Sequence, residues 1–264
     1  MQSWKINIFL KGLVFPLPVK KLSKMTLSLK QMNDGDYIDE KRTEFESSIL
    51  NRKIVSIKNI DKNNIKFIIE KCKQNNFDYI VSQIDTNQPE LISAMIDNGF
   101  RIYGGNVVLK NKLKGEYKIN IKVREYEKKD LKQIKQMTRG AFPKVHWYNN
   151  KYLNKDKIDE MYVKWVENSC NGRADIVFVY EENDKVLGYL TCYKRLELLV
   201  VSSEARRKGV GSALVRTGLD YYKNKNFKEV SLKVEMLNIP VLNLHLKCGS
   251  ELHSVVLNIN KWLK

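Results

Sequence analysis

A strand, a glycine-containing turn and a helix are predicted in succession between Leu196 and Asn224. The apolar run Leu196–Val201 is typical of a buried strand. Beyond the turn, apolar residues recur at helical spacing: Val210, Leu214, Val215, Leu219 and Tyr222. Between these elements, the pattern Arg206-x-x-Gly209-x-Gly211 places two glycines at the start of the helix.

This turn has the chemistry of an anion-binding site. The first turn of a helix carries backbone N–H groups without partners, and the helix dipole adds partial positive charge there. Glycines allow the main chain to approach a diphosphate, and Arg206, Arg207 and Lys208 add full charges. The spacing matches neither a P-loop nor a dinucleotide-binding turn. The alternative is a basic surface turn closed by glycines.

The order of the surrounding elements narrows this choice. A strand is predicted at 229–234, and Asn238-x-Pro240 then opens a helix that ends at Cys248-Gly249. Together with the turn, this order resembles the GNAT acyltransferases over Tyr117 to Lys264. The resemblance implies an α/β fold, the GNAT fold with a mixed central sheet. It also implies an acyl-CoA-dependent N-acyltransferase that uses acyl-CoA as co-substrate and no metal.

Composition limits the other classes of protein. Hydrophobic residues make up 43% of the 264 residues, which is enough for a substantial core. No apolar run reaches the ~20 residues of a membrane span, so no membrane partner is expected. The apolar segment Ile6–Val14 is interrupted by Lys11 and lacks a small-residue cleavage site, which argues against a signal peptide. The four cysteines are scattered, which favours a reducing cytoplasm over zinc or disulfides.

The net charge of +17 could indicate nucleic acid. However, the lysines are spread along the whole chain, and no zinc knuckle, helix-turn-helix or RNA-binding signature is present. We therefore expect no nucleic-acid partner, and some benefit of the charge for anionic small molecules. A basic nucleic-acid-binding module or a CoA-sensing regulator is the non-enzymatic alternative.

The N-terminal part contains a weak internal echo of the C-terminal one. After an irregular leader up to Thr43, strands and helices are predicted in alternation at 54–57, 65–74, 79–84, 91–98 and 106–109. The segment Ile84–Pro89, followed by a helix and Gly99, mirrors Val234–Pro240, followed by a helix and Gly249, with a spacing that differs by one residue. We expect a smaller, degenerate GNAT-like α/β domain at 1–112, a linker at 110–116 and the catalytic domain at 117–264.

The catalytic domain is predicted to contain several further elements. Strands are expected at 119–123, 176–180 and 186–193, and helices at 130–138 and 155–168. A loop rich in ring side chains, residues 142–148, precedes the second of these helices.

A narrower resemblance rests on three features. They are the segment 162–169 after the aromatic loop, the degenerate domain with Phe45-x-x-x-Ile49, and the ending at 251–264. They resemble the GNAT-type N-acyltransferases of dTDP-linked amino sugars (dTDP-fucosamine type). This implies transfer from acetyl-CoA or 3-hydroxybutyryl-CoA to a 3-amino or 4-amino group of a dTDP-linked 6-deoxyhexose, for O-antigen or another surface polysaccharide. Acetylation of a protein, an antibiotic or another small amine is the alternative, and a homodimer stays open.

The GNAT resemblance assigns the acyl-CoA contacts. They are Leu199, Val200, Val201, Arg206, Arg207, Lys208, Gly209, Val210, Gly211, Ser212 and Asn238. In the family the two central strands splay beside the phosphate loop, and an exposed N–H near Val200 or Val201 then meets the thioester carbonyl. Asn238 would bind the pantetheine arm, although a helix cap before Pro240 explains it equally well.

The candidate catalytic residues are histidines, since imidazole exchanges protons near neutral pH. His245 occupies the helix position where the family usually carries a tyrosine as general acid, and Gly249-Ser250 replaces its usual Gly-Phe. Either His245 supplies the proton or the enzyme lacks a side-chain acid. His146 lies in the aromatic loop with Lys144 and Tyr148, and all three are candidate acceptor contacts. His146 is also the candidate base, although a structural role is open for both histidines.

Overall fold

A computed structural model describes residues 37–264, which form one compact unit. The predictions for residues 1–36, including the interrupted apolar segment, lie outside the described residues. The end of the expected irregular leader is ordered: it forms the short strand β1 (Ile38–Asp39) and a 3-10 helix (Lys41–Thr43). Within 37–264, no helix is long and apolar enough to cross a membrane.

The first half of the described chain alternates helices and strands. After β1 come α2 (Glu44–Leu50), β2 (Ile54–Ile57), α3 (Ile65–Gln74), β3 (Tyr79–Val81), β4 (Gln83–Asp85), α4 (Pro89–Asp97) and β5 (Arg101–Lys112). The bounds of β2 and α3 are those predicted. The strand expected at 79–84 is divided into β3 and β4 at Ser82, and α2 has no counterpart among the predicted elements.

The second half contains the predicted strand–turn–helix stretch. Its elements are β6 (Arg124–Glu125), α5 (Leu131–Thr138), α6 (Lys155–Asn168), β7 (Ile176–Glu182), β8 (Lys185–Cys192), β9 (Leu196–Val201), α7 (Val210–Asn224), β10 (Glu229–Glu235), α8 (Ile239–Lys247) and β11 (Glu251–Trp262). A 3-10 helix, His146–Asn149, lies in the aromatic loop. The strand expected at 119–123 is absent. Its side chains Ile121 and Val123 pack against the core, but the backbone pairs only at β6.

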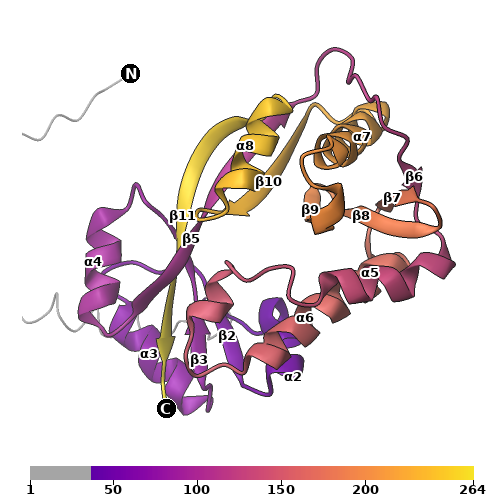
Figure 1. The fold of residues 1–264 in the computed structure, drawn as a ribbon. Helices are drawn as coiled ribbons and strands as arrows, with labels where there is room; N and C mark the ends of the chain where they lie inside the picture. The colour runs from indigo at the N-terminus through magenta and orange to yellow at the C-terminus, as the bar shows by residue number, and fades with distance from the viewer. Residues whose placement is uncertain (1–36) are drawn as a thin grey trace, which may run out of the picture. The chain divides into compact units, whose positions relative to one another are not determined.

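The strands form two sheets. One has the order β1-β2-β3-β11-β5-β10, with β4 also paired to β11, and the other has the order β6-β7-β8-β9. Among the strands of residues 37–264, only β2 and β3 pair in parallel, so the larger sheet is mixed. The long strands β5 and β11 are antiparallel partners at its centre (Figure 1).

The two internal units resemble each other more clearly in the structure than in the sequence. β5 (Arg101–Lys112) and β11 (Glu251–Trp262) are offset by 150 residues at both ends. The N–H of Thr86 donates to the carbonyl of Val255 at 3.0 Å, and at the same offset the N–H of Met236 donates to Gly105 at 2.9 Å. The two strand–helix–strand units are therefore related by a local pseudo-twofold.

This pairing is a strand exchange between the two halves. β5 of the first half lies between β10 and β11, and β11 of the second half lies between β4 and β5. Residues 110–112, predicted as part of a linker, belong to β5 and pair with residues 229–231 of β10. The predicted halves on either side of residues 113–116 thus share one sheet.

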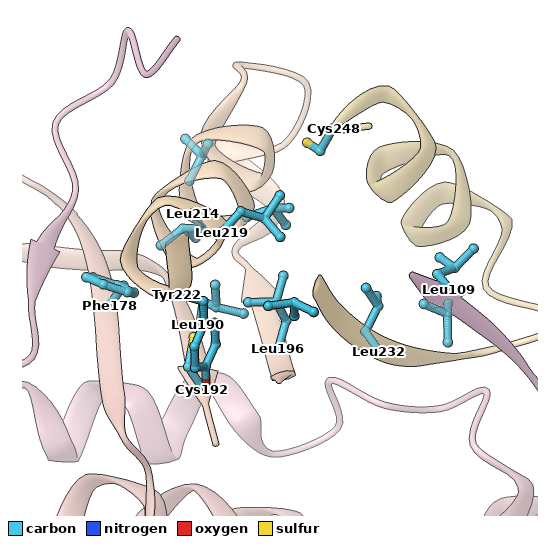
Figure 2. Close-up of a cluster of buried hydrophobic side chains, with 14 of the residues drawn as sticks. Leu109, Phe178, Leu190, Cys192, Leu196, Leu214, Leu219, Tyr222, Leu232 and Cys248 are labelled. Carbon is cyan, nitrogen blue, oxygen red and sulfur yellow. The ribbon is translucent and has the colours of Figure 1, made fainter. Parts of the chain in front are cut away.

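A hydrophobic cluster holds α7 against both sheets. Figure 2 shows Leu196 from β9 and Leu232 from β10 in the same cluster as Leu214 and Leu219 of α7. All four side chains are at most 4% exposed. Burial of leucine side chains of this kind contributes roughly 1.5–3 kcal/mol each. The packing fixes the start of α7, and therefore the loop before it.

Candidate active site

The loop before α7 has the backbone geometry of an anion cradle. Arg207 and Gly209 both have left-handed backbone angles, with φ of 64° and 88°, and Gly209 is the N-cap of α7. Such alternation turns successive N–H groups toward one concave side. The Nε of Arg206 donates to the carbonyl oxygen of Val201 at 3.1 Å, which joins the loop to the end of β9.

The two glycines of this loop have different surroundings. At Gly209 the positive φ strains any side chain, whatever the space around it. At Gly211 a Cβ would lie 3.2 Å from Cδ2 of Leu244, so this glycine lets α8 pack closely on α7. Both were predicted to make room for a diphosphate. The structure gives Gly211 a packing role as well.

The strand before the loop has an open edge. β9 and β10 belong to different sheets and are not hydrogen-bonded to each other. The N–H groups of Leu198 and Ser202 donate toward β8, to Thr191 Oγ1 at 3.1 Å and to the Leu187 carbonyl at 2.9 Å. Because backbone direction alternates along a strand, the N–H groups of Leu199 and Val201 face the open edge.

In the first half, the strands that correspond to β9 and β10 are hydrogen-bonded to each other, so no open edge lies between them. β2 and β3 pair in parallel, with Ile54 opposite Tyr79. Beside them, Lys62 and Glu90 form an ion pair of 2.8 Å between the loop before α3 and the start of α4. The β9–β10 edge is therefore the open one of the two.

A cavity of about 1350 Å³ begins at this edge. It is lined by most of the predicted acyl-CoA residues: Leu199, Val200, Val201, Arg206, Arg207, Gly209, Gly211, Ser212 and Asn238. Two predicted residues do not line it. Lys208 is exposed elsewhere, and Val210 is 1% exposed within the hydrophobic cluster. The cavity continues past the aromatic loop to α2, so both halves contribute to it.

Asn238 lines the cavity, and its side chain does not cap the helix. It is the N-cap of α8, yet its side chain makes no capping hydrogen bond, and Pro240 follows in the first turn. The carboxamide is therefore available to a ligand. This geometry favours the pantetheine role over the capping role.

His146 is held by Glu235, a residue that the sequence analysis missed. Glu235 Oε1 lies 3.0 Å from His146 Nδ1 and accepts the His146 backbone N–H at 3.2 Å. The two side chains are only 16% and 13% exposed. A Cβ on Gly104 of β5 would lie 3.3 Å from the His146 Cβ, so a bare glycine admits the histidine. The only sequence signal for Glu235 was a carboxylate at the end of a strand, just before Asn238.

A second carboxylate, Glu46 of α2, faces the same part of the cavity. Burial raises its pKa, while the charges of Arg42 and His146 act in the opposite direction. Its Oε2 is buried and has no hydrogen-bond partner among residues 37–264. The first half thus supplies an acidic group next to the histidine–carboxylate pair.

The other two predicted acceptor residues differ in position. Lys144 lines the cavity, and its Nζ donates to the Leu237 carbonyl at 3.2 Å. Tyr148 does not line the cavity, because its hydroxyl donates to Asp159 Oδ1 at 2.5 Å. Burial and this carboxylate both raise the pKa of Tyr148. The hydrogen bond to Asp159 ties the aromatic loop to α6.

His245 lines the cavity but is 3% exposed. Burial lowers the pKa of its imidazole to about 4, so the ring is neutral at physiological pH. Its Nδ1 has no hydrogen-bond partner within the described part of the chain. Among the same residues, no group of three or more histidine, cysteine or acidic side chains could hold a metal ion.

Part of the chain is similar to known acetyltransferases. Residues 142–250 match the model of the acetyltransferase (GNAT) family. The spore coat polysaccharide biosynthesis protein SpsD of Bacillus subtilis is 24% identical over 125 residues, which cover 46% of this chain and 43% of SpsD. Streptothricin acetyltransferase A of the same organism is 26% identical over 104 residues, covering 38% of this chain and 59% of that protein.

A solved structure extends the likeness to most of the fold. The GCN5-related N-acetyltransferase from Sphaerobacter thermophilus superposes with a TM-score of 0.59 at 10% identity, over 92% of this chain and 85% of that one. The chain spans about half the length of the two curated relatives. The predicted fold class is confirmed: the chain has the α/β GNAT fold with a mixed sheet.

Proposed function

We propose that this protein is an acyl-CoA-dependent N-acyltransferase whose acceptor is an amino sugar linked to dTDP. One observation carries the proposal. A single cavity joins the phosphate loop and the open edge of β9 to the His146–Glu235 pair. Donor and acceptor can therefore meet in one continuous space.

The donor would bind along the second half. The N–H groups of the loop and the cations Arg206 and Arg207 suit the diphosphate of CoA. The pantetheine arm would run along the open edge of β9 and reach Asn238. The N–H of Leu199 or Val201 would then donate to the thioester oxygen. A fixed donor of this kind stabilises the negative charge that develops on that oxygen during attack.

The acceptor amine must lose a proton before or during attack. Glu235 accepts from Nδ1–H of His146, which leaves Nε2 as the proton acceptor. The amine nitrogen would form a bond to the thioester carbon, its proton would pass to His146, and the C–S bond would break. The role of Glu235 would be to fix the tautomer and orientation of the imidazole and to stabilise its protonated form.

The departing thiolate needs a hydrogen-bond donor or a proton. His245 is our candidate, acting as a neutral donor, since its imidazolium is scarce above about pH 4. A neutral N–H can stabilise the negative sulfur as the C–S bond breaks. The proton taken by His146 can then reach the sulfur through bound water or be released with the product.

Two observations favour a sugar acceptor. SpsD, to which the chain is similar, is described as a polysaccharide biosynthesis protein. The part of the cavity beyond the His146–Glu235 pair is polar and includes cations from both halves, which suits a hydroxylated acceptor that carries phosphates. The likeness to streptothricin acetyltransferase A favours an antibiotic amine as the second candidate.

The experiment is a thiol-release assay with a panel of amines. Acetyl-CoA and 3-hydroxybutyryl-CoA are each offered with dTDP-linked 3-amino and 4-amino-6-deoxyhexoses, streptothricin, spermidine and a lysine peptide. We expect acceptor-dependent release of CoA with a dTDP-linked amino sugar and with none of the others. Release with streptothricin alone would favour the second candidate, and no release with any amine would contradict the proposed activity.

A further inference from the structure

The cavity floor beyond the His146–Glu235 pair is formed by amide and cationic side chains from four strands. Gln83 Nε2 donates to Asn258 Oδ1 at 2.9 Å and to Asn106 Oδ1 at 3.4 Å. Lys233 Nζ donates to Gln83 Oε1 at 2.6 Å. Gln83 lies on β4, Asn106 on β5, Lys233 on β10 and Asn258 on β11. All four residues line the cavity.

The exchanged strands bring these side chains to one face. Gln83 is opposite Asn258 in the β4–β11 pair, and Asn106 is opposite Glu235 in the β5–β10 pair. Opposite residues in antiparallel strands share a face of the sheet. Lys233, two residues before Glu235, therefore lies on the same face as the carboxylate that holds His146. The floor is continuous with the proposed acceptor site.

Lys233 is fixed on this floor with other cations near it. Its single described side-chain bond, to Gln83, is to a neutral amide, and no carboxylate among residues 37–264 forms an ion pair with it. Arg42 and Arg195 line the same cavity as Lys233. Partial burial lowers the pKa of Lys233, and the charges of Arg42 and Arg195 lower it further. Arg195 pairs with Glu197 at 3.4 Å, but Arg42 has no ion-pair partner in the same range. Lys233 and Arg42 are thus cations without an ion-pair partner among residues 37–264, and Glu46 is the carboxylate whose pKa the charge of Arg42 lowers.

We propose that Arg42, Lys233 and Arg195 bind an anionic group of the acceptor, a phosphate or a carboxylate, at a site distinct from the CoA phosphate loop. Gathered cations repel one another, and an anion between them removes that repulsion and accepts charge-assisted hydrogen bonds. The amides of Gln83, Asn106 and Asn258 would then face the hydroxyl-rich part of the same molecule. The inference rests on the proposed function only in calling this ligand the acceptor.

The position of the cluster explains why the ligand is the acceptor rather than CoA. The loop at 206–209 already supplies cations and N–H groups for a diphosphate at the start of α7. Arg42 comes from the first half, next to α2, and Lys233 lies beside Glu235. An anion held there would place the rest of its molecule near His146.

The test is the binding of dTDP to the full-length protein saturated with CoA, measured by calorimetry. CoA occupies the phosphate loop, so dTDP reports on the second site alone. Arg42→Gln and Lys233→Gln should each raise the dTDP Kd about tenfold or more, the loss expected for one charge-assisted hydrogen bond. Lys112→Gln is the matched control, since Lys112 lies on β5, pairs with Glu251 and is outside the cavity lining. Its dTDP Kd should not change.

Glucuronate, tested in parallel, distinguishes a carboxylate ligand from a phosphate ligand. Tighter binding of glucuronate than of dTDP, lost in the same two variants, would keep the anion site and assign it to a carboxylate. CoA affinity is measured in every variant to confirm folding. If folded Arg42→Gln and Lys233→Gln proteins bind both anions as the wild type does, the inference is overturned. Anion binding that depends on these residues, without acyl transfer to any amine, would support the site and contradict the proposed function.

Discussion

His245 and Met95 occupy equivalent positions on α8 and α4, at the offset of 150 residues that relates the two halves. Met95 is fully buried, and His245 is nearly so. This helix position therefore holds an apolar side chain in the first half of the chain. In the second half it holds an imidazole that lines the cavity beginning at the open edge of β9. Packing alone does not require a histidine there, since an apolar side chain serves in the equivalent place.

The methionine at the equivalent position makes His245→Met the natural test of this residue. His245→Met should lower kcat by about 10²-fold, the usual loss for one transition-state hydrogen bond, and should leave the KM for acyl-CoA nearly unchanged. Steady-state kinetics at saturating acceptor measure both constants. A kcat close to that of the wild type would make His245 a packing residue.

The same residue gives a prediction for stability against pH. The pKa of His245 is about 4 in the folded protein, against an ordinary value of 6.5. Between these values the unfolded chain binds more protons, so acid favours unfolding. The free energy of unfolding should fall by up to about 3 kcal/mol from pH 6.5 to pH 4 on account of this residue.

Urea unfolding at a series of pH values measures this dependence. His245→Met should show a correspondingly smaller fall across the same range, because methionine does not titrate. Other titrating groups are common to both proteins and cancel in the comparison. Equal slopes in the two proteins would show that the imidazole is not buried as described.

At the scale of elements, the two glycines between β9 and the first turn of α7 have different structural roles. Gly209 has a left-handed backbone, and Gly211 leaves room for the side chain of Leu244. Gly209→Val should raise the KM for acyl-CoA by tenfold or more, because a β-branched residue disfavours this backbone and so distorts the cradle. Gly211→Ala should change this KM little, since the flexible end of Leu244 can yield. Equal effects of the two changes on donor KM would contradict the distinction.

Local patterns were sufficient to predict most of the elements. β2, α3, α6 and β9 have the predicted bounds because each carries its periodicity within itself. The strand predicted at 119–123 is wrong, because an alternating apolar pattern indicates which side chains are buried but not whether the backbone has a partner strand. Its side chains reach the core, as the pattern indicates, while pairing is limited to Arg124 and Glu125.

The candidate site was predicted only in its local part. The loop from Arg206 to Gly211 is contiguous in sequence, so its motif was visible. Glu235, Glu46 and Lys233 meet His146 or one another through contacts between distant segments, and no local pattern marks them. The sequence also does not show which way a loop side chain points: Tyr148, predicted to contact the acceptor, donates its hydroxyl to Asp159 and does not line the cavity.

At the scale of the whole described unit, the two halves exchange a strand. β5 is hydrogen-bonded to both β10 and β11, so the second half is not a separate sheet. We propose that residues 37–112 are a degenerate copy of the GNAT unit. In that copy the strand edge is closed, and its remaining roles are to complete the sheet and to form the far wall of the cavity.

This arrangement predicts that residues 117–264 will not fold alone. Without β5, long edges of β10 and β11 would be unpaired, and such edges favour aggregation. The fragment should be insoluble or lack cooperative unfolding, and co-expression with residues 1–116 should restore a soluble complex. A soluble, cooperatively unfolding fragment that binds CoA would contradict the structural role given to β5.

The central claim is that an acceptor amine loses its proton to the His146–Glu235 pair and attacks acyl-CoA bound at β9. The direct measurement is the single-turnover rate of acyl transfer in Glu235→Gln, with saturating acyl-CoA and acceptor. Glu229→Gln is the matched control, since Glu229 lies on the same strand, pairs with Lys110 and is outside the cavity lining. Glu235→Gln should slow transfer at least 10²-fold without changing the acyl-CoA Kd, and Glu229→Gln should not slow it. A folded Glu235→Gln protein that transfers the acyl group at the wild-type rate would contradict the account.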